Sequence, residues 1–138
     1  MEQKDYLKRE IEKIGLIIAA IRQKLLGGKA CTAVTIERDF EVTKEMLLSS
    51  INFDLDQFLN NENESSMAYI QTFSGFNVEN LESLALFLMQ IAHNIETAKA
   101  HKYLEKSMHL FELCNQKDKT YSAERESKVL EIKSALMY

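Results

Sequence analysis

Aliphatic residues recur at alternating spacings of four and three near the start of the chain, a pattern typical of one buried helix face. The positions of this seam are Leu7, Ile11, Ile14, Ile18, Ile21 and Leu25. The pattern predicts a helix over about residues 5–26 that ends at Gly27-Gly28. Leu16, Ala19 and Ala20 lie off the seam, so the middle of the helix is apolar nearly all round. We expect later helices of the chain to cover this second side; the alternative is a second copy of the chain.

A second helix is predicted over about residues 32–50 because apolar residues again recur at helical spacing. Its buried side would carry Ile36, Phe40, Leu47 and Ile51. After it, the run NNENESS predicts a polar loop over 60–66. A short helix capped by Ser65 or Ser66 would follow.

Two later helix starts carry capping signatures. Asp54 is followed by Gln57 three residues on, the spacing of a capping box, and Phe53 and Phe58 stand where a hydrophobic staple closes the first turn.

Asn77 repeats this pattern, with Phe76 and Leu81 as the staple pair. The helix that it begins is strongly apolar and is expected to end near Asn94.

Two more helices are predicted, over about 97–114 and 119–137. No linker divides the chain, so residues 1–138 form a single predicted domain. The expectation is an all-α, compact bundle of about five to seven helices. Composition supports this, because 138 residues contain no proline and four glycines, too few turn residues for most sheet proteins.

The charge pattern narrows the function classes. The net charge is −4 and the basic residues are scattered among acidic ones, which disfavours nucleic-acid binding. The charged N-terminal sequence does not resemble a secretory leader, and no apolar run approaches the roughly 18 residues of a membrane span. Cys31 and Cys114 lie far apart, which favours a cytoplasmic protein with reduced thiols.

The three histidines, His93, His101 and His109, follow one another at intervals of eight residues. Two positions eight apart on a helix lie roughly 12 Å apart along its axis, too far to share one zinc ion. An alternative metal site would add Glu105 and Glu112, which lie on the same helix face as the last two histidines. Lys102 and Lys106 flank that face, which argues against a bound cation. We therefore expect a solvated face with ion pairs such as Glu105–His109, and no metal or zinc site.

The same region resembles a tetratricopeptide repeat (TPR), a two-helix repeat with small residues at its packing positions. Ala100, Leu104 and Ser107 match the second helix of the repeat, and Leu84, Phe87 and Ile91 fall near the packing positions of the first. Leu88 stands where the repeat needs a small residue, and no proline follows. The resemblance predicts a TPR-like helical hairpin within residues 77–138; the alternative is an ordinary antiparallel hairpin.

A wider resemblance covers most of the chain. DYLKREIEKI, LLSSINFDLDQFL and FNVENLESLALFLMQIA look like parts of an uncharacterised family of small bacterial all-helical proteins. The resemblance implies a fold and supplies neither an activity nor functional residues.

The sequence favours a non-enzymatic helical scaffold or adaptor that binds a protein partner, since no catalytic, cofactor-binding or metal-ligating set assembles. A homodimer through the first helix is one version of this hypothesis, using Leu7, Ile11, Ile14, Leu16, Ile18, Ile21 and Leu25. The alternative is a small-molecule binder or enzyme with a pocket between helices. Candidate residues for that pocket are Tyr69, His93, Tyr103 and Tyr121. A third option is a regulator that acts on a nucleic-acid process through a protein partner.

Overall fold

A computed structural model describes the backbone of residues 2–27, 33–119 and 122–137, which form seven α-helices and no strand. The helices are α1 (Glu2–Gly27), α2 (Ala33–Ile51), α3 (Leu55–Asn60), α4 (Asn63–Gln71), α5 (Val78–Ala92), α6 (Thr97–Asp118) and α7 (Ala123–Leu136). The predicted all-α bundle is therefore confirmed. The predictions made for Leu25, Cys31 and Tyr121 concern residues outside those whose side chains are described.

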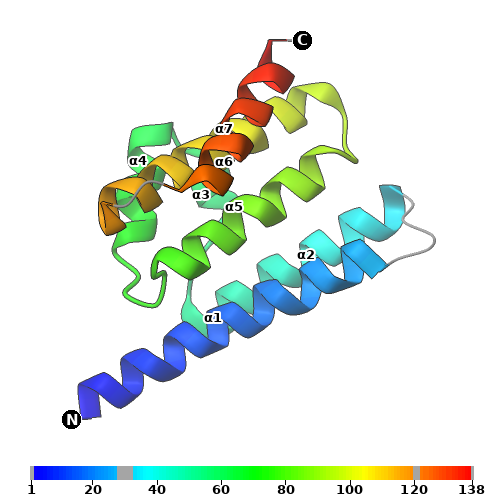
Figure 1. Cartoon of the computed structure of the whole chain (residues 1–138). Helices are drawn as coiled ribbons and strands as arrows, with labels where there is room; N and C mark the ends of the chain where they lie inside the picture. Colours follow the sequence, from blue (N-terminus) through cyan, green and yellow to red (C-terminus); the bar gives the residue numbers. More distant parts are fainter. Residues whose placement is uncertain (1, 28–32, 120–121, 138) are drawn as a thin grey trace.

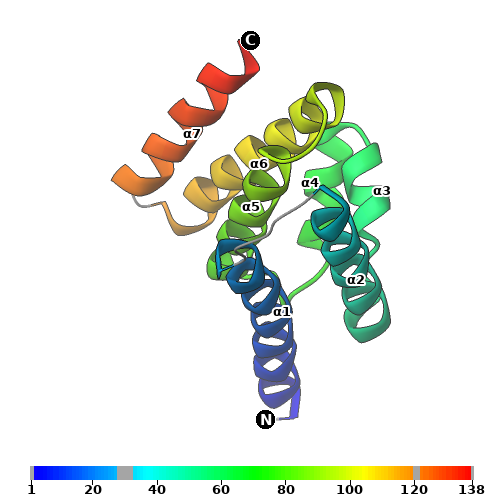
Figure 2. The same ribbon diagram turned by 90° about the vertical axis from the view of Figure 1, so that its right-hand side faces the viewer.

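The helices pack in the order α2, α1, α5, α6 and α7 (Figure 1). α1 and α2 form an antiparallel pair, and α5 lies between α1 and α6. The short helices α3 and α4 connect the end of α2 to the rest of the bundle and pack against α6. Figure 2 shows α7 at the edge of the molecule, beyond α6 and far from α1.

The seam of α1 faces the core along its second half. Ile14 and Ile18 have no exposed surface, and Ile17 and Ile21 are also buried, whereas Leu7 is 36% exposed. The expectation that later helices cover the other side of α1 is wrong. Leu16 is 71% exposed, and Ala19 and Ala20 are exposed as well. α2 and α5 both approach α1 from its seam side, which leaves the opposite side uncovered.

α1 is fastened to the start of α5 by a buried amide. Asn80 donates two hydrogen bonds from Nδ2, to the carbonyl of Ile11 at 2.9 Å and to that of Gly75 at 2.8 Å. Gly75 lies so close to α1 that a Cβ there would be 2.8 Å from the side chains of Glu10 and Ile14. These contacts fix α1 against the α4–α5 junction.

Both predicted caps are present. Asp54 Oδ1 accepts a hydrogen bond from the Gln57 amide at 3.1 Å, and Asn77 Oδ1 accepts from the Asn80 amide at 3.0 Å. The reciprocal half of the capping box differs from the expectation, because the Asp54 amide donates to the Tyr69 hydroxyl at 2.9 Å.

The aromatic rings around this turn pack together. The rings of Phe53 and Phe58 lie 5.8 Å apart, as the staple predicted, and Phe53 also packs at 5.4 Å from Tyr69. The staple residues Phe76 and Leu81 are both buried.

The predicted loop over 60–66 is wrong in its second half. α4 already begins at Asn63, and its N-cap residue is Glu62, whose side chain makes no cap hydrogen bond. Ser66 lies inside the helix and is buried; its hydroxyl donates to the carbonyls of Phe58 and Asn61. The serine therefore joins α4 to α3 instead of capping it.

Lys106 also departs from expectation, because it is buried instead of lying on a solvated face. Its Nζ donates to the Asn61 carbonyl and to Asn63 Oδ1, each at 2.6 Å. Burial lowers the pKa of this amine. The side chain thus holds the α3–α4 junction against α6.

α5 and α6 form the antiparallel hairpin that the sequence indicated. Ala100, Leu104 and Ser107 are buried, and the Ser107 hydroxyl donates to the Ala85 carbonyl at 2.6 Å. Small residues here let the two helices approach closely. The assignment of the hairpin to the TPR class stays a prediction.

Arg125 holds α7 to the hairpin. Its guanidinium lies 3.3 Å from Glu82 on α5 and 2.7 Å from Asp118 at the end of α6. Across the described ranges, no helix is both long enough and apolar enough to cross a membrane.

Candidate functional site

An open groove of about 740 Å³ lies between α2, α3 and the start of α6, and we call it the α2–α6 groove. Its apolar and aromatic lining consists of Ile36, Phe40, Leu59, Ile91, Ile95 and Tyr103. Four of these side chains are buried in the core, so they form the base of the groove. Its charged lining consists of Glu37, Arg38, Glu41, Lys44, Asp56, Glu96, Lys99 and Lys102.

A stack of three aromatic rings joins the helices at the base. The inward-facing pattern of α2 buries Phe40, whose ring lies 5.6 Å from that of Tyr103 on α6, with an angle of 24° between the planes. Phe40 also stacks at 6.1 Å on Phe87 of α5. Stacked aromatic pairs of this kind stabilise packing beyond the area that they bury. The base of the groove is therefore part of the packed core.

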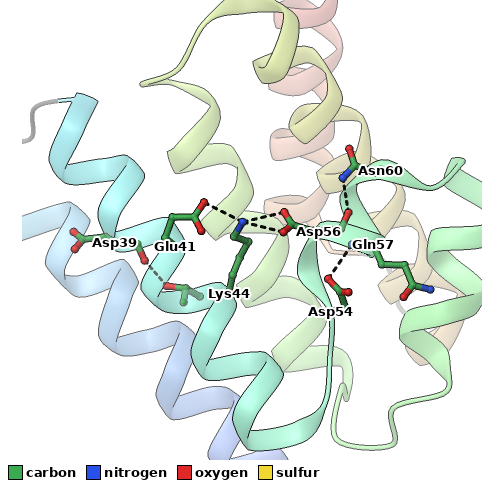
Figure 3. A network of polar contacts seen from close by, with 8 residues as sticks. Asp39, Glu41, Lys44, Asp54, Asp56, Gln57 and Asn60 are labelled. Atoms are coloured by element: carbon green, nitrogen blue, oxygen red, sulfur yellow. Dashed lines mark hydrogen bonds and ion pairs between the residues drawn. The ribbon is translucent and has the colours of Figure 1, made fainter.

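Lys44 is the central cation of the groove (Figure 3). Its Nζ donates to both carboxylate oxygens of Asp56 at 3.0 Å and lies 2.9 Å from Glu41 Oε1. The same amine lies 5.6 Å from the centre of the Phe40 ring. The Lys44 side chain is 17% exposed, whereas Glu41 and Asp56 are 59% and 60% exposed, so these ion pairs are open to water on the carboxylate side.

A second set of polar contacts continues from α3 to α6. Asn60 Nδ2 donates to the Asp56 carbonyl at 2.8 Å, and Lys102 Nζ donates to Asn60 Oδ1 at 2.8 Å. α3 is thus held between α2 and α6 by side chains from both neighbours. Asp54 serves as the helix cap of α3, and Asp56 is the partner of Lys44.

Two groups in the groove, Lys44 and Tyr103, have raised pKa values and keep their protons at neutral pH. Burial alone would lower the pKa of Lys44, but the hydrogen bonds and charges of Glu41 and Asp56 outweigh it and raise the pKa. Burial raises the pKa of Tyr103. A lysine that acts as a base or nucleophile needs a lowered pKa, so Lys44 is not tuned for proton transfer.

Four rim charges make no hydrogen bond or ion pair with another described residue. They are Glu37, Arg38, Glu96 and Lys99. All four are exposed at the mouth of the groove. These groups can pair with a bound molecule at little cost, because no existing contact has to break.

The structure separates the candidate pocket residues named from the sequence. Tyr103 lines the groove. Tyr69 packs against the ring of Phe53, and its hydroxyl accepts a hydrogen bond from the Asp54 amide. His93 is exposed at the end of α5 and does not line the groove. Tyr121 lies outside the described residues.

The other two histidines lie on the half-buried side of α6. His109 Nδ1 lies 3.6 Å from a carboxylate oxygen of Glu112, so this contact joins residues three apart, where the sequence predicted a Glu105–His109 pair. Within the described ranges, no three His, Cys, Asp or Glu side chains gather closely enough to hold a metal ion.

The sequence patterns do not indicate Lys44 and Asp56 as residues of a groove. Phe40 was recognised as a core position, but its stack on Tyr103 joins residues far apart in the chain. The lysine and aspartate are twelve positions apart and belong to different helices. The capping signature at Asp54 placed the start of α3, and it is the one local signal that bears on where Asp56 lies.

Comparison of the chain with protein-family models, with curated proteins and with solved structures gives no match in any of the three. The resemblance to a bacterial all-helical family stays a prediction.

Proposed function

We propose that the chain is a non-enzymatic protein-interaction module that binds an amphipathic segment of a partner protein in the α2–α6 groove. The observation that carries this proposal is the combination of a packed apolar base with rim charges of both signs that make no ion pair with another described residue. An amphipathic helix docks in this way, with its apolar face in a groove and its polar edges at the rim.

The charges on the two walls of the groove determine which charged residues the partner segment should carry. Glu37 and Arg38 stand on the α2 wall, and Glu96 and Lys99 stand on the α6 wall. A segment with acidic and basic residues on both edges of its apolar face would find a partner on each wall. A uniformly acidic or basic segment would meet like charges.

The protonation of the groove supports binding over catalysis. Both Lys44 and Tyr103 have raised pKa values, which leaves the groove without a base among these two groups at neutral pH. A volume of about 740 Å³ also suits a small molecule, since such sites span about 300–1,000 Å³. The open side of the groove favours a longer polypeptide ligand.

We place this module in the cytoplasm. Cys114 is a buried free thiol, as expected for a protein in a reducing compartment. The scattered charges that disfavour a nucleic-acid partner also support a protein partner.

The proposal is tested by affinity purification of matched variants from the native cell. The groove variant combines Glu37→Lys with Lys99→Glu. The control combines Glu131→Lys with Lys133→Glu on the exposed side of α7, which keeps the same net charge. Mass spectrometry identifies the proteins that each variant retains, and a synthetic segment of the recovered partner is then titrated against each.

We expect the wild type and the α7 control to retain the partner and to bind its segment equally. The groove variant should lose both. Equal retention by all three proteins would contradict the groove as the binding surface. If the wild type retains a small molecule that the groove variant loses, the groove binds a small molecule and the proposal of a protein ligand is wrong.

A further inference from the structure

α1 has a second face that stays exposed among the described helices, and we call it the outer α1 face. It consists of Tyr6, Arg9, Glu12, Lys13, Leu16, Ala19 and Ala20, all of which are exposed. Its residues Tyr6, Arg9 and Lys13 border a hollow beside the end of α2. Tyr6 is 70% exposed and Leu16 is 71% exposed. These positions repeat at helical spacing on the side opposite the buried seam, so they form one continuous strip.

Exposed large apolar side chains are more frequent on the α1–α2 pair than on the other described helices. Eight large apolar side chains are exposed among the described residues, and six of them lie on α1 and α2. These six are Tyr6, Leu7, Leu16, Val42, Met46 and Leu48. The α1–α2 pair is covered by α5 on one side, and its other side faces outward (Figure 1). Such a concentration marks an interaction surface.

We propose that the outer α1 face binds the same face of a second copy of this chain, with the two α1 helices antiparallel. In one antiparallel register, Glu12 lies opposite Lys13 of the second copy. A two-fold axis repeats that contact, as in an isologous dimer. The strip is therefore complementary to itself in charge.

The same register matches the apolar positions in size. Tyr6 lies opposite Ala19 of the second copy, where a small side chain leaves room for the ring. Leu16 lies opposite Arg9, whose aliphatic stem can cover it. A second copy thus covers the exposed leucine that the chain's own helices leave open.

Two other arrangements of the two helices bring like charges together. A parallel pair in register would place Arg9 against Arg9 and Glu12 against Glu12. Sliding the antiparallel pair by three residues toward the N-terminus would place Arg9 against Lys13. Like-charge contacts of this kind act against the wrong arrangement. The charges therefore favour the stated register over these two arrangements.

Sedimentation equilibrium of the full chain over a concentration series tests the register. The variants are Glu12→Lys, Lys13→Glu and the double swap that combines them, with Leu130→Glu on α7 as the control. Each single change puts like charges together at both symmetry-related contacts and should weaken the dimer about tenfold, whereas the swap restores both pairs. The control should match the wild type.

Leu16→Glu should give a monomer whose circular dichroism matches the wild type, since the residue is outside the chain's own core. Its thermal melt should match the wild type at protein concentrations low enough for the wild type to be monomeric. A wild-type protein that stays monomeric at the highest concentration would overturn the proposal. A double swap no stronger than the single variants would overturn the register. Because no residue of this strip lines the α2–α6 groove, either outcome is independent of partner binding in the groove.

Discussion

Cys114 shows how burial controls the chemistry of a single side chain. The residue is fully buried on α6, and burial raises the pKa of its thiol to about 11. Because the thiolate is the reactive form, iodoacetamide at pH 8 should leave Cys114 unmodified in the folded protein. Peptide mass spectrometry should find it modified in urea. Rapid alkylation under native conditions would show that α6 and its neighbours open readily.

The same thiol predicts the direction of alkaline destabilisation. Its pKa is about 11 in the folded state against an ordinary 9.0, so the folded protein holds the proton more tightly. The stability linked to this group is complete below about pH 9 and is lost as the pH rises through the folded value. Urea unfolding at several pH values should show this loss, and Cys114→Ala should show a shallower one. Parallel curves for the two proteins would exclude Cys114 as the cause.

Gly75 tests how closely α1 approaches the α4–α5 junction. Gly75→Ala should lower the free energy of unfolding by about 1–3 kcal/mol, the usual cost of overpacking. The added Cβ would lie 2.8 Å from the side chains of both Glu10 and Ile14. Ser74→Ala is the control, because Ser74 is exposed. If urea melts of the two variants coincide, the contact is looser than the structure shows.

At the scale of elements, the N-caps define where helices begin. Asp54→Ala and Asn77→Ala should each cost about 0.5–2 kcal/mol, because each removes a cap hydrogen bond. Glu62→Ala provides the matched control, since Glu62 occupies the N-cap of α4 without a side-chain bond. Denaturant melts should separate the two cap variants from the control. Three overlapping curves would contradict the cap assignments.

The two sides of α1 predict opposite sensitivities to the same truncation. Ile18 has no exposed surface, so Ile18→Ala should cost about 2–5 kcal/mol. Leu16 is 71% exposed, and Leu16→Ala should change the stability of the monomer by less than about 0.5 kcal/mol. Urea unfolding at low protein concentration measures both. A costly Leu16→Ala would mean that α1 is covered on both sides after all.

These elements also show what a sequence can and cannot predict here. The caps at Asp54 and Asn77 could be predicted from the sequence because the cap and its amide partner are three residues apart. The role of Lys106 could not be predicted, because its carbonyl partner at Asn61 is 45 positions away. The polar run that contains Asn61 therefore looked like a loop, although part of it begins α4.

At the scale of the whole molecule, the groove forms because α2, α3 and α6 pack next to one another. α3 can bring Asp56 to Lys44 because α2 ends at Ile51, where Asn52 takes a left-handed backbone conformation with φ of 61°. α6 then supplies Tyr103 from the other side. The sequence predicted the helices on which these residues stand, but helical periodicity does not encode which helices meet.

Hydrogen exchange of the protein, alone and with its recovered partner, tests the groove as a binding surface most directly. Binding in the groove predicts slower exchange in the segments 37–44 and 96–103, which contribute its lining. α7 and the outer α1 face should exchange at unchanged rates. Slower exchange confined to α7 or to the outer α1 face, with the groove unaffected, would contradict binding in the groove.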